Sequence, residues 1–158
     1  MMAILYQEDG KNFKIMEKIH SNNGTLLAII VPFSDFNKAR NEIVPESEFL
    51  QGAAIRVSEG DRFRPHKHIW KSFNSQYSYG EIKTQECWVV IQGLIKVVIY
   101  DENEAIVRTA TLNRGDAVFL LHGGHTFECL EDHTCIWELK TGPYEGQAKD
   151  KIFIDGKS

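Results

Sequence analysis

The sequence has few of the features that mark a membrane protein or a nucleic-acid-binding protein. Its apolar runs are much shorter than the roughly 20 residues that span a bilayer. Lys and Arg number 18 and Asp and Glu number 22, so the net charge is −4, and no long run carries one sign. A basic surface for nucleic acid is therefore not expected. We predict no membrane partner and no nucleic-acid partner.

Cysteine is scarce as well. The three cysteines, Cys87, Cys129 and Cys135, are an odd number. The first residues, Met1 to Ile4, lack the basic and long apolar regions of a secretory signal peptide. These observations favour free thiols in a reducing, cytoplasmic location. The sequence also lacks internal repeats and low-complexity segments, and its 158 residues are enough for one globular core.

Turn signals recur at short intervals, and β-rich runs lie between them. Asp9-Gly10, Gln92-Gly93 and Arg114-Gly115 are three examples of these turns. The expected strands cover residues 13–18, 26–31, 52–58, 86–92, 94–100, 105–112, 116–121, 126–130 and 134–140. One short helix is expected over residues 34–42, with Ser34 or Asp35 as its N-cap. Many short strands between turns predict an all-β sandwich or barrel.

The pair His66-Lys67-His68 is the strongest sign of chemistry. Side chains alternate along a strand, so two histidines at i and i+2 lie on the same face. An acid and a third histidine from later strands would complete a site of four ligands, and Glu86 and His125 are the candidates. Three imidazoles and one carboxylate suit Fe, Mn, Ni, Co, Zn or Cu as divalent ions. An octahedral ion would keep two open positions for water or substrate.

These residues resemble the two sequence motifs of the cupin superfamily. The matching positions are Gly60, His66, His68, Glu86 and Gly93 in the first motif, and Gly115, Asp116 and His125 in the second. The resemblance spans about residues 50 to 140. It implies a cupin-type double-stranded β-helix, or jelly-roll barrel, with N-terminal strands and one short helix. It also implies one divalent metal ion held by His66, His68, Glu86 and His125.

The resemblance predicts one cupin domain over residues 1–158. N-terminal strands and the short helix would occupy residues 1–49 and pack on the barrel. Residues 50–140 would form the barrel with both motifs, and residues 141–158 would be a C-terminal tail.

Two features depart from the usual cupin pattern. Residues 69–85 insert 17 positions between the histidine pair and Glu86, where cupins have only a few. We still favour Glu86 because it keeps its own spacing to Gly93. In the second motif the histidine stands one residue closer to the opening glycine than is usual, so His122 remains an alternative third ligand. We favour His125 because the preceding glycine pair lets the chain turn it inward.

Other residues near these motifs are candidates for roles in the site. Trp88 lies two residues after Glu86 and is expected to share its inward face, where it would either form a wall of the pocket or simply fill the barrel. His122 and Glu128 are the only candidate catalytic bases that the sequence offers. The insertion is rich in aromatic residues and would serve as a dimer contact or as a lid over the site. We favour the dimer contact and expect a homodimer.

The predicted function is a metal-dependent enzyme acting on a small polar or sugar-like metabolite. The chain looks like cupin-fold metalloproteins associated with polysaccharide and nucleotide-sugar metabolism, and this resemblance suggests isomerisation or epimerisation. One alternative is an Fe(II)-dependent dioxygenase. Another, of a different class, is a non-catalytic cupin that binds or senses a small molecule. The identity of the metal would separate the first two, and a site closed to solvent would favour the third.

Overall fold

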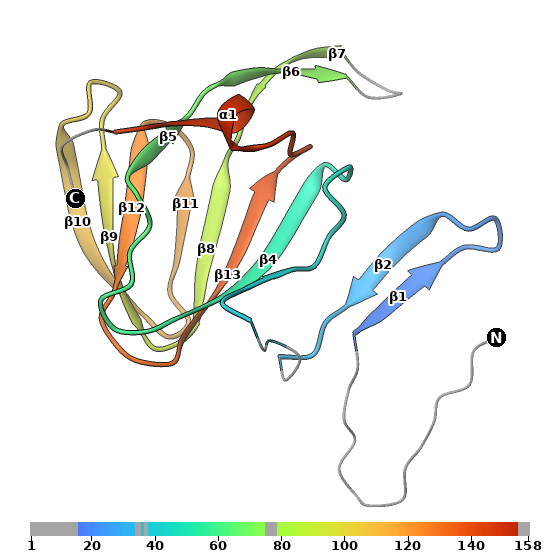
Figure 1. Cartoon of the computed structure of the whole chain (residues 1–158), viewed down its shortest axis with the longest axis horizontal. Coiled ribbons are helices and arrows are strands. Elements are labelled where there is room, and N and C mark those ends of the chain that lie inside the picture. The colour runs from blue at the N-terminus through green and yellow to red at the C-terminus, as the bar shows by residue number, and fades with distance from the viewer. Residues whose placement is uncertain (1–15, 34–35, 37, 75–78, 155–158) are drawn as a thin grey trace, which may run out of the picture. The chain divides into compact units, whose positions relative to one another are not determined.

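The computed structural model describes residues 16–33, 36, 38–74 and 79–154. The chain divides into two compact units, with the boundary between residues 37 and 38. In the first unit, β1 (Glu17–His20) and β2 (Leu26–Ile30) pair as an antiparallel hairpin (Figure 1). The prediction of a single domain divided at residues 49 and 140 stays a prediction.

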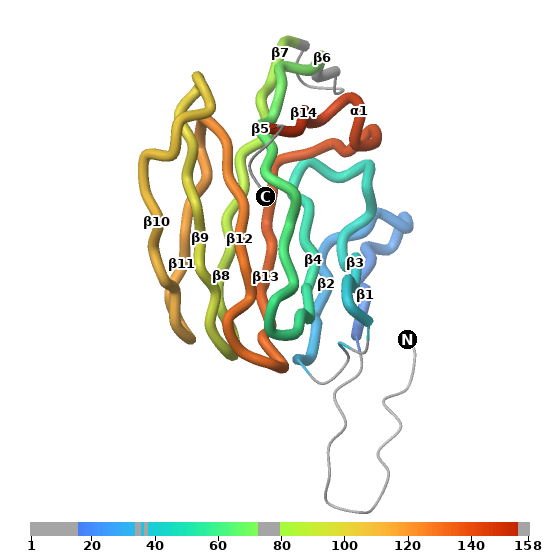
Figure 2. The backbone as a smooth tube through the Cα atoms, turned by 60° about the vertical axis from the view of Figure 1, so that its left-hand side comes forward, coloured from blue at the N-terminus to red at the C-terminus, as the bar shows by residue number. Residues whose placement is uncertain are grey.

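The second unit is built from two five-stranded sheets with antiparallel pairing. One sheet has the order β10-β9-β12-β5-β14, and the other has the order β11-β8-β13-β4-β3. The bounds are β3 Arg40–Glu42, β4 Leu50–Val57, β5 His66–His68, β8 Glu86–Gln92, β9 Leu94–Tyr100, β10 Ile106–Asn113, β11 Ala117–Leu120, β12 Gly124–Cys129, β13 Thr134–Thr141 and β14 Lys151–Phe153. Figures 1 and 2 show the sheets facing each other as the walls of a barrel. The predicted all-β jelly-roll fold is confirmed.

A hairpin and a short helix lie at one end of this barrel. The hairpin consists of β6 (Trp70–Asn74) and β7 (Tyr79–Lys83), and it follows β5 directly along the chain. Helix α1 (Gln147–Asp150) leads into β14. Both figures place the hairpin, α1 and β14 at the same end. No helix within the described ranges is long and apolar enough to be a membrane span.

The hydrophobic core lies between the two sheets. From Glu86 to Ile91, strand β8 alternates between buried and partly exposed residues, because successive side chains of a strand point to opposite faces. Trp88 and Val90 therefore point into the core, while Cys87 points away. The buried cluster consists of Ile55, Trp88, Val90, Ile95, Val97, Leu120, Phe127 and Ile136. All three cysteines are free, as the sequence predicted.

Most of the predicted strands are present. The seven expected between residues 52 and 140 correspond to β4 and to β8 through β13, and their ends differ by two residues at most. The strand expected at 26–31 is β2, and the one at 13–18 overlaps β1, although its first three residues lie outside the described ranges. The histidine pair lies on β5, as its spacing predicted.

The helix predicted over residues 34–42 is wrong where the structure describes it. Arg40–Glu42 form β3, which pairs with Ala53, Ala54 and Ile55 of β4; residues 34, 35 and 37 lie outside the described ranges. An isolated short helix is marginal in water, whereas the edge of a sheet offers backbone hydrogen bonds. The four short elements β6, β7, α1 and β14 were not predicted.

The turn between β8 and β9 depends on Gly93, and this gives a test of the packing. Gly93 has a φ of +85°, and a Cβ there would lie 2.0 Å from Thr134 Oγ1 and 2.7 Å from Thr134 Cα. Gly115 has a φ of +90°, but a Cβ added there would have open space around it. Gly93→Ala should therefore lower the free energy of unfolding by about 3 kcal/mol or more, and Gly115→Ala by about 1–2 kcal/mol. Urea denaturation measures both values, and equal losses would contradict the packing at Thr134.

Candidate metal centre

Four buried side chains meet inside the barrel. His66 and His68 come from β5, Glu86 begins β8, and His125 lies on β12. One potential ligand atom from each lies within 4.8 Å of all the others. Each of the four residues is at most 4% exposed. The structure thus brings together the four residues that the sequence nominated as metal ligands.

The strand pairing explains why these residues meet. Strand β12 pairs with β5 so that His125 stands opposite His66, and both imidazoles belong to the same sheet. Glu86 belongs to the facing sheet and reaches the cluster across the barrel. Gly124 precedes His125 where the chain is tightly packed, since a Cβ there would lie 2.4 Å from Ile154 Cδ1. A residue with a side chain would require the end of the Ile154 side chain to move and would crowd the carbonyl oxygen of His66 at 3.2 Å.

Hydrogen bonds fix the orientation of two of the imidazole rings. Nδ1 of His66 lies 2.9 Å from the carbonyl oxygen of Arg64, and Nδ1 of His68 lies 3.2 Å from the carbonyl oxygen of Asp150. A carbonyl only accepts hydrogen bonds, so these partners assign the proton to Nδ1 in both rings. With Nδ1 facing the backbone, Nε2 is the nitrogen of each ring that would bind a metal ion, and it does so in its deprotonated state.

The polar atoms of the cluster fit a divalent transition metal ion. Nε2 of His68 lies 3.1 Å from Oε1 of Glu86, and Nε2 of His125 lies 3.4 Å from Oε2. Both nitrogens are buried, and neither has a partner with hydrogen-bonding geometry in the described part of the chain. Buried polar atoms without partners are uncommon and call for an explanation such as a bound ion. Three imidazoles and one carboxylate supply the donors that such an ion prefers.

The cluster is electrostatically asymmetric. Burial opposes a charge on His68, but the neighbouring carboxylates of Asp150 and Glu86 outweigh it and raise its pKa to about 9. Burial, together with the charges of His125 and Lys151, lowers the pKa of His66 to about 3. Burial also disfavours ionised Glu86, yet His125 and His68 hold its pKa well below the usual value. The carboxylate is therefore ionised and attracts a cation.

Of the remaining predicted site residues, Trp88 contacts the cluster, whereas His122 and Glu128 lie outside it. His122 is exposed and lies outside the cluster, so the structure places His125 there instead. Trp88 is fully buried, with its ring 5.3 Å from that of His125, so it packs against the cluster from the core side. Glu128 lies on the opposite face of β12 from His125 and pairs with Arg62 and Lys96. The geometry gives no support to His122 or Glu128 as a catalytic base.

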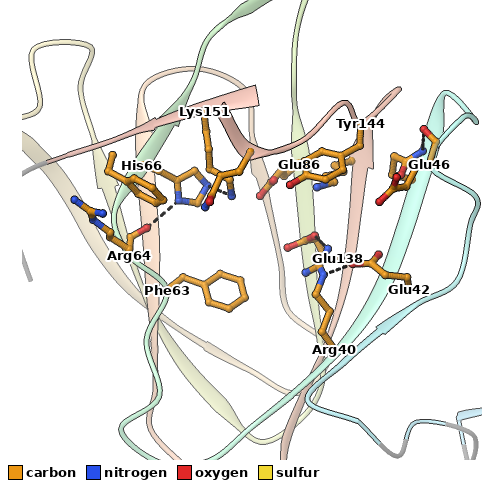
Figure 3. A pocket seen from close by; sticks show the side chains of 14 residues that line it. Arg40, Glu42, Glu46, Phe63, Arg64, His66, Glu86, Glu138, Tyr144 and Lys151 are labelled. Atoms are coloured by element: carbon orange, nitrogen blue, oxygen red, sulfur yellow. Dashed lines mark hydrogen bonds and ion pairs between the residues drawn. The ribbon is translucent and has the colours of Figure 1, made fainter. Parts of the chain in front are cut away.

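A cavity of about 330 Å³ adjoins the cluster, and His66 and Glu86 form part of its wall (Figure 3). On one side Lys151 from β14 places Nζ 3.2 Å from Nε2 of His66. On another side Arg40 donates to the buried carboxylate of Glu138 at 2.6 Å. The cavity is thus lined by charged and hydrogen-bonding groups as well as by the candidate ligands.

Sequence reasoning missed the residues that line this cavity beside the ligands. Lys151 and Tyr144 belong to the segment predicted as a tail, and Arg40 belongs to the segment predicted as a helix. Their sequence spacing gives no signal, because the cavity is assembled from distant segments. The pairing of β14 with β5, which sets Lys151 opposite His68, brings the lysine into the site.

The stability of the metal-free protein should depend on pH through His68. Its pKa is about 9 in the folded state and 6.5 ordinarily, so folding takes up a proton between these values. This contribution is fully present below pH 6.5 and is lost as the pH rises through about 9. The loss is on the order of 3 kcal/mol, because one pKa unit is worth about 1.4 kcal/mol. Urea unfolding in the presence of a chelator measures the decline. His68→Gln should flatten it, and an unchanged decline would contradict the assignment.

Comparison with known proteins gives likenesses of structure only. No protein-family model matches the chain, and no curated protein matches it. KdgF from Halomonas sp. superposes with a TM-score of 0.51 and 19% identity, over 67% of this chain and 79% of KdgF. Oxalate decarboxylase from Bacillus subtilis superposes with a TM-score of 0.54 and 19% identity, over 73% of this chain and 27% of the enzyme.

Further structures of the Bacillus subtilis enzyme agree with this result. A variant of it gives a TM-score of 0.57 at 20% identity, over 83% of this chain and 33% of the enzyme. Another study of the same enzyme, with a TM-score of 0.52, concerns its Mn(II) centres. The chain spans about a third or less of the length of oxalate decarboxylase. The motifs, the two facing sheets and these likenesses agree, and the chain is a cupin-fold protein.

Proposed function

We propose that this protein is a metal-dependent enzyme that isomerises or epimerises a small polar or sugar-like metabolite. The observation that carries the proposal is the cluster of three histidines and one glutamate in the wall of a polar cavity. The cavity volume of about 330 Å³ is at the lower end of the range for small-molecule sites, which is roughly 300–1,000 Å³. When bound, a divalent ion would polarise a carbonyl or hydroxyl oxygen of the substrate.

Mn(II) is the first ion to test. The Bacillus subtilis oxalate decarboxylase that shares the fold has Mn(II) centres. The donor set of this chain also suits Fe, Ni, Co, Zn and Cu, because imidazole nitrogen and carboxylate oxygen bind all of these ions. Metal analysis of the purified protein therefore decides the identity of the ion.

We propose Lys151 as the group that holds and moves a proton, in place of His122 and Glu128. Its ammonium projects into the cavity beside His66, on the side where a bound substrate would lie. Burial lowers its pKa, which brings proton exchange nearer to neutral pH. Arg40 and the buried Glu138 form an ion pair in the same cavity and would orient the hydroxyl groups of the substrate.

Metal content tests the first part of the proposal. Protein purified without a metal-affinity tag should contain about one equivalent of a divalent transition metal, and His66→Ala/His68→Ala should contain almost none. A chelator should lower the melting temperature of the wild type and leave the variant unchanged, because an ion that binds only the folded state stabilises it. Equal metal content in the two proteins would refute the site.

Hydrogen exchange tests the reaction. Isomerisation or epimerisation beside a carbonyl removes a carbon-bound proton, so the substrate should take up deuterium in heavy water. Nuclear magnetic resonance spectroscopy of a panel of aldoses, ketoses and sugar acids with Mn(II)-loaded protein detects this uptake. Retained Fe(II) with oxygen consumption would instead favour the dioxygenase. A sugar that binds without exchange or turnover would favour a non-catalytic binding protein.

The variant Lys151→Met separates chemistry from metal binding. Removing the ammonium 3.2 Å from Nε2 of His66 removes a charge that repels a cation, so metal affinity should be equal to or higher than that of the wild type. Deuterium uptake should fall by about 10²–10⁴-fold, which is the usual contribution of a positioned acid or base. Lys149→Met, which changes an exposed lysine of α1, serves as the control. Unchanged uptake in Lys151→Met would remove Lys151 from the mechanism.

The homodimer and the cytoplasmic location remain predictions of the sequence. Analytical ultracentrifugation of the metal-loaded protein at several concentrations measures the oligomeric state.

A further inference from the structure

A buried carboxylate outside the cavity connects the inserted hairpin to the metal centre. Asp150, the last residue of α1, is 1% exposed. Its Oδ1 accepts hydrogen bonds from Nζ of Lys71 and from Oγ1 of Thr84, each at 2.6 Å. Its Oδ2 lies 3.2 Å from Nδ1 of His68, which is an ion-pair distance without hydrogen-bonding geometry. One carboxylate therefore bridges the hairpin and a candidate metal ligand.

Both ends of the hairpin contribute to this contact. Lys71 is the second residue of β6 and follows His68 by three positions, whereas Thr84 comes directly after β7. The Lys71 side chain is only 9% exposed, and its Nζ also donates to the carbonyl oxygen of Pro143 at 3.1 Å. The backbone amide of Ile69 donates to the carbonyl oxygen of Asp150 at 3.1 Å. The insertion is thus joined at its base to the C-terminal segment.

Burying the ion pair of Lys71 and Asp150 costs free energy, and holding the hairpin in place does not by itself require that pair. Burying a carboxylate and an ammonium is unfavourable, and an apolar pair of similar size is often at least as stable. The hairpin also has a simpler anchor near the surface, where Lys83 pairs with the exposed Glu102 at 3.1 Å. What the buried pair adds is a fixed position, since two hydrogen bonds on Oδ1 hold the carboxylate with Oδ2 3.2 Å from Nδ1 of His68.

The rings of His68 and His66 differ in the groups that face their Nδ1 atoms. Only a backbone carbonyl, that of Arg64, accepts from Nδ1 of His66 among the described contacts. Nδ1 of His68 faces both the carbonyl and the carboxylate of Asp150. A carboxylate behind a ligating histidine fixes the orientation of the ring and makes its other nitrogen a stronger donor.

We propose that Lys71 and Asp150 are positioning residues of the metal centre, and that the inserted hairpin sets metal affinity by holding the Asp150 carboxylate against His68. This inference rests on the proposed metal site. The insertion then acts on the metal centre, because its Lys71 holds the Asp150 carboxylate that lies beside the candidate ligand His68.

Metal titration of the folded protein tests this inference. The proteins are wild type, Asp150→Asn, Lys71→Met, Lys71→Arg and the control Lys149→Met, and the probes are Mn(II) and Co(II) added to chelated protein. Asp150→Asn and Lys71→Met should each raise the dissociation constant by about 10- to 100-fold, as expected for residues that support a ligand. Lys71→Arg should restore most of the affinity, because guanidinium keeps the ion pair. Lys149→Met should match the wild type.

The visible spectrum of bound Co(II) gives a second measurement. If Lys71 and Asp150 only stabilised the fold, the spectrum of the bound ion would not change in their variants. Its absorption bands report ligand geometry and should shift in Asp150→Asn and Lys71→Met but not in Lys149→Met. Circular dichroism of the metal-free proteins checks that each variant is folded. Thr84→Val removes a single hydrogen bond to the same Oδ1, and it should shift the spectrum in the same direction if Lys71→Met does not fold.

The outcomes distinguish this inference from the proposed function. A wild type that binds Co(II), with Lys71→Met and Asp150→Asn matching its affinity and spectrum, would overturn the inference and leave the metal centre standing. A wild type that binds neither ion would overturn both. Weaker binding in Lys71→Met, with recovery in Lys71→Arg, supports the inference.

Discussion

The buried Glu86 carboxylate is the constraint on which the rest of the site depends. Glu86 is the first residue of β8, faces the imidazoles of His68 and His125, and is 4% exposed. A buried charge of this kind is tolerated only when it is paired and hydrogen-bonded. The two facing sheets provide the pairing, because one supplies the acid and the other supplies the histidines at ion-pair distances of 3.1 and 3.4 Å. A bound cation would supply the partner that the two imidazole nitrogens lack in the described part of the chain. A cation held between the two sheets would join the two walls of the barrel.

The surroundings of the cluster divide the remaining charges into two groups. On the cavity side, Lys151, Arg40 and Glu138 are in reach of a small molecule. Behind the His68 ring, Lys71 and Asp150 form a pair that is closed to solvent. Charges in the cavity can act on a substrate, whereas charges behind the ring can only orient a ligand. This division follows from strand alternation and from the path of the C-terminal segment across the end of the barrel.

Sequence patterns identified the parts of the molecule that local rules control. The alternation in β8 and β9, and the glycine turn between them, are local signals, and the strands they predicted are present. The predicted helix over residues 34–42 failed because the edge of β4 offered β3 a better set of hydrogen bonds than an isolated helix could make. The hairpin of β6 and β7 escaped prediction because its strands are short and because Lys71 contacts Asp150, which is distant in sequence.

The sequence by itself determined an all-β chain, the strand-spaced pair His66 and His68, and the candidacy of Glu86 and His125, because these follow from side-chain periodicity and motif spacing. Only the tertiary structure decided that His125 and not His122 joins the cluster, and that Glu128 points away. It also brought Lys151 to His66 and Asp150 to His68. The reason is physical. Spacing along a strand fixes which face a side chain occupies, but its neighbours across the barrel depend on sheet pairing and on where the chain returns.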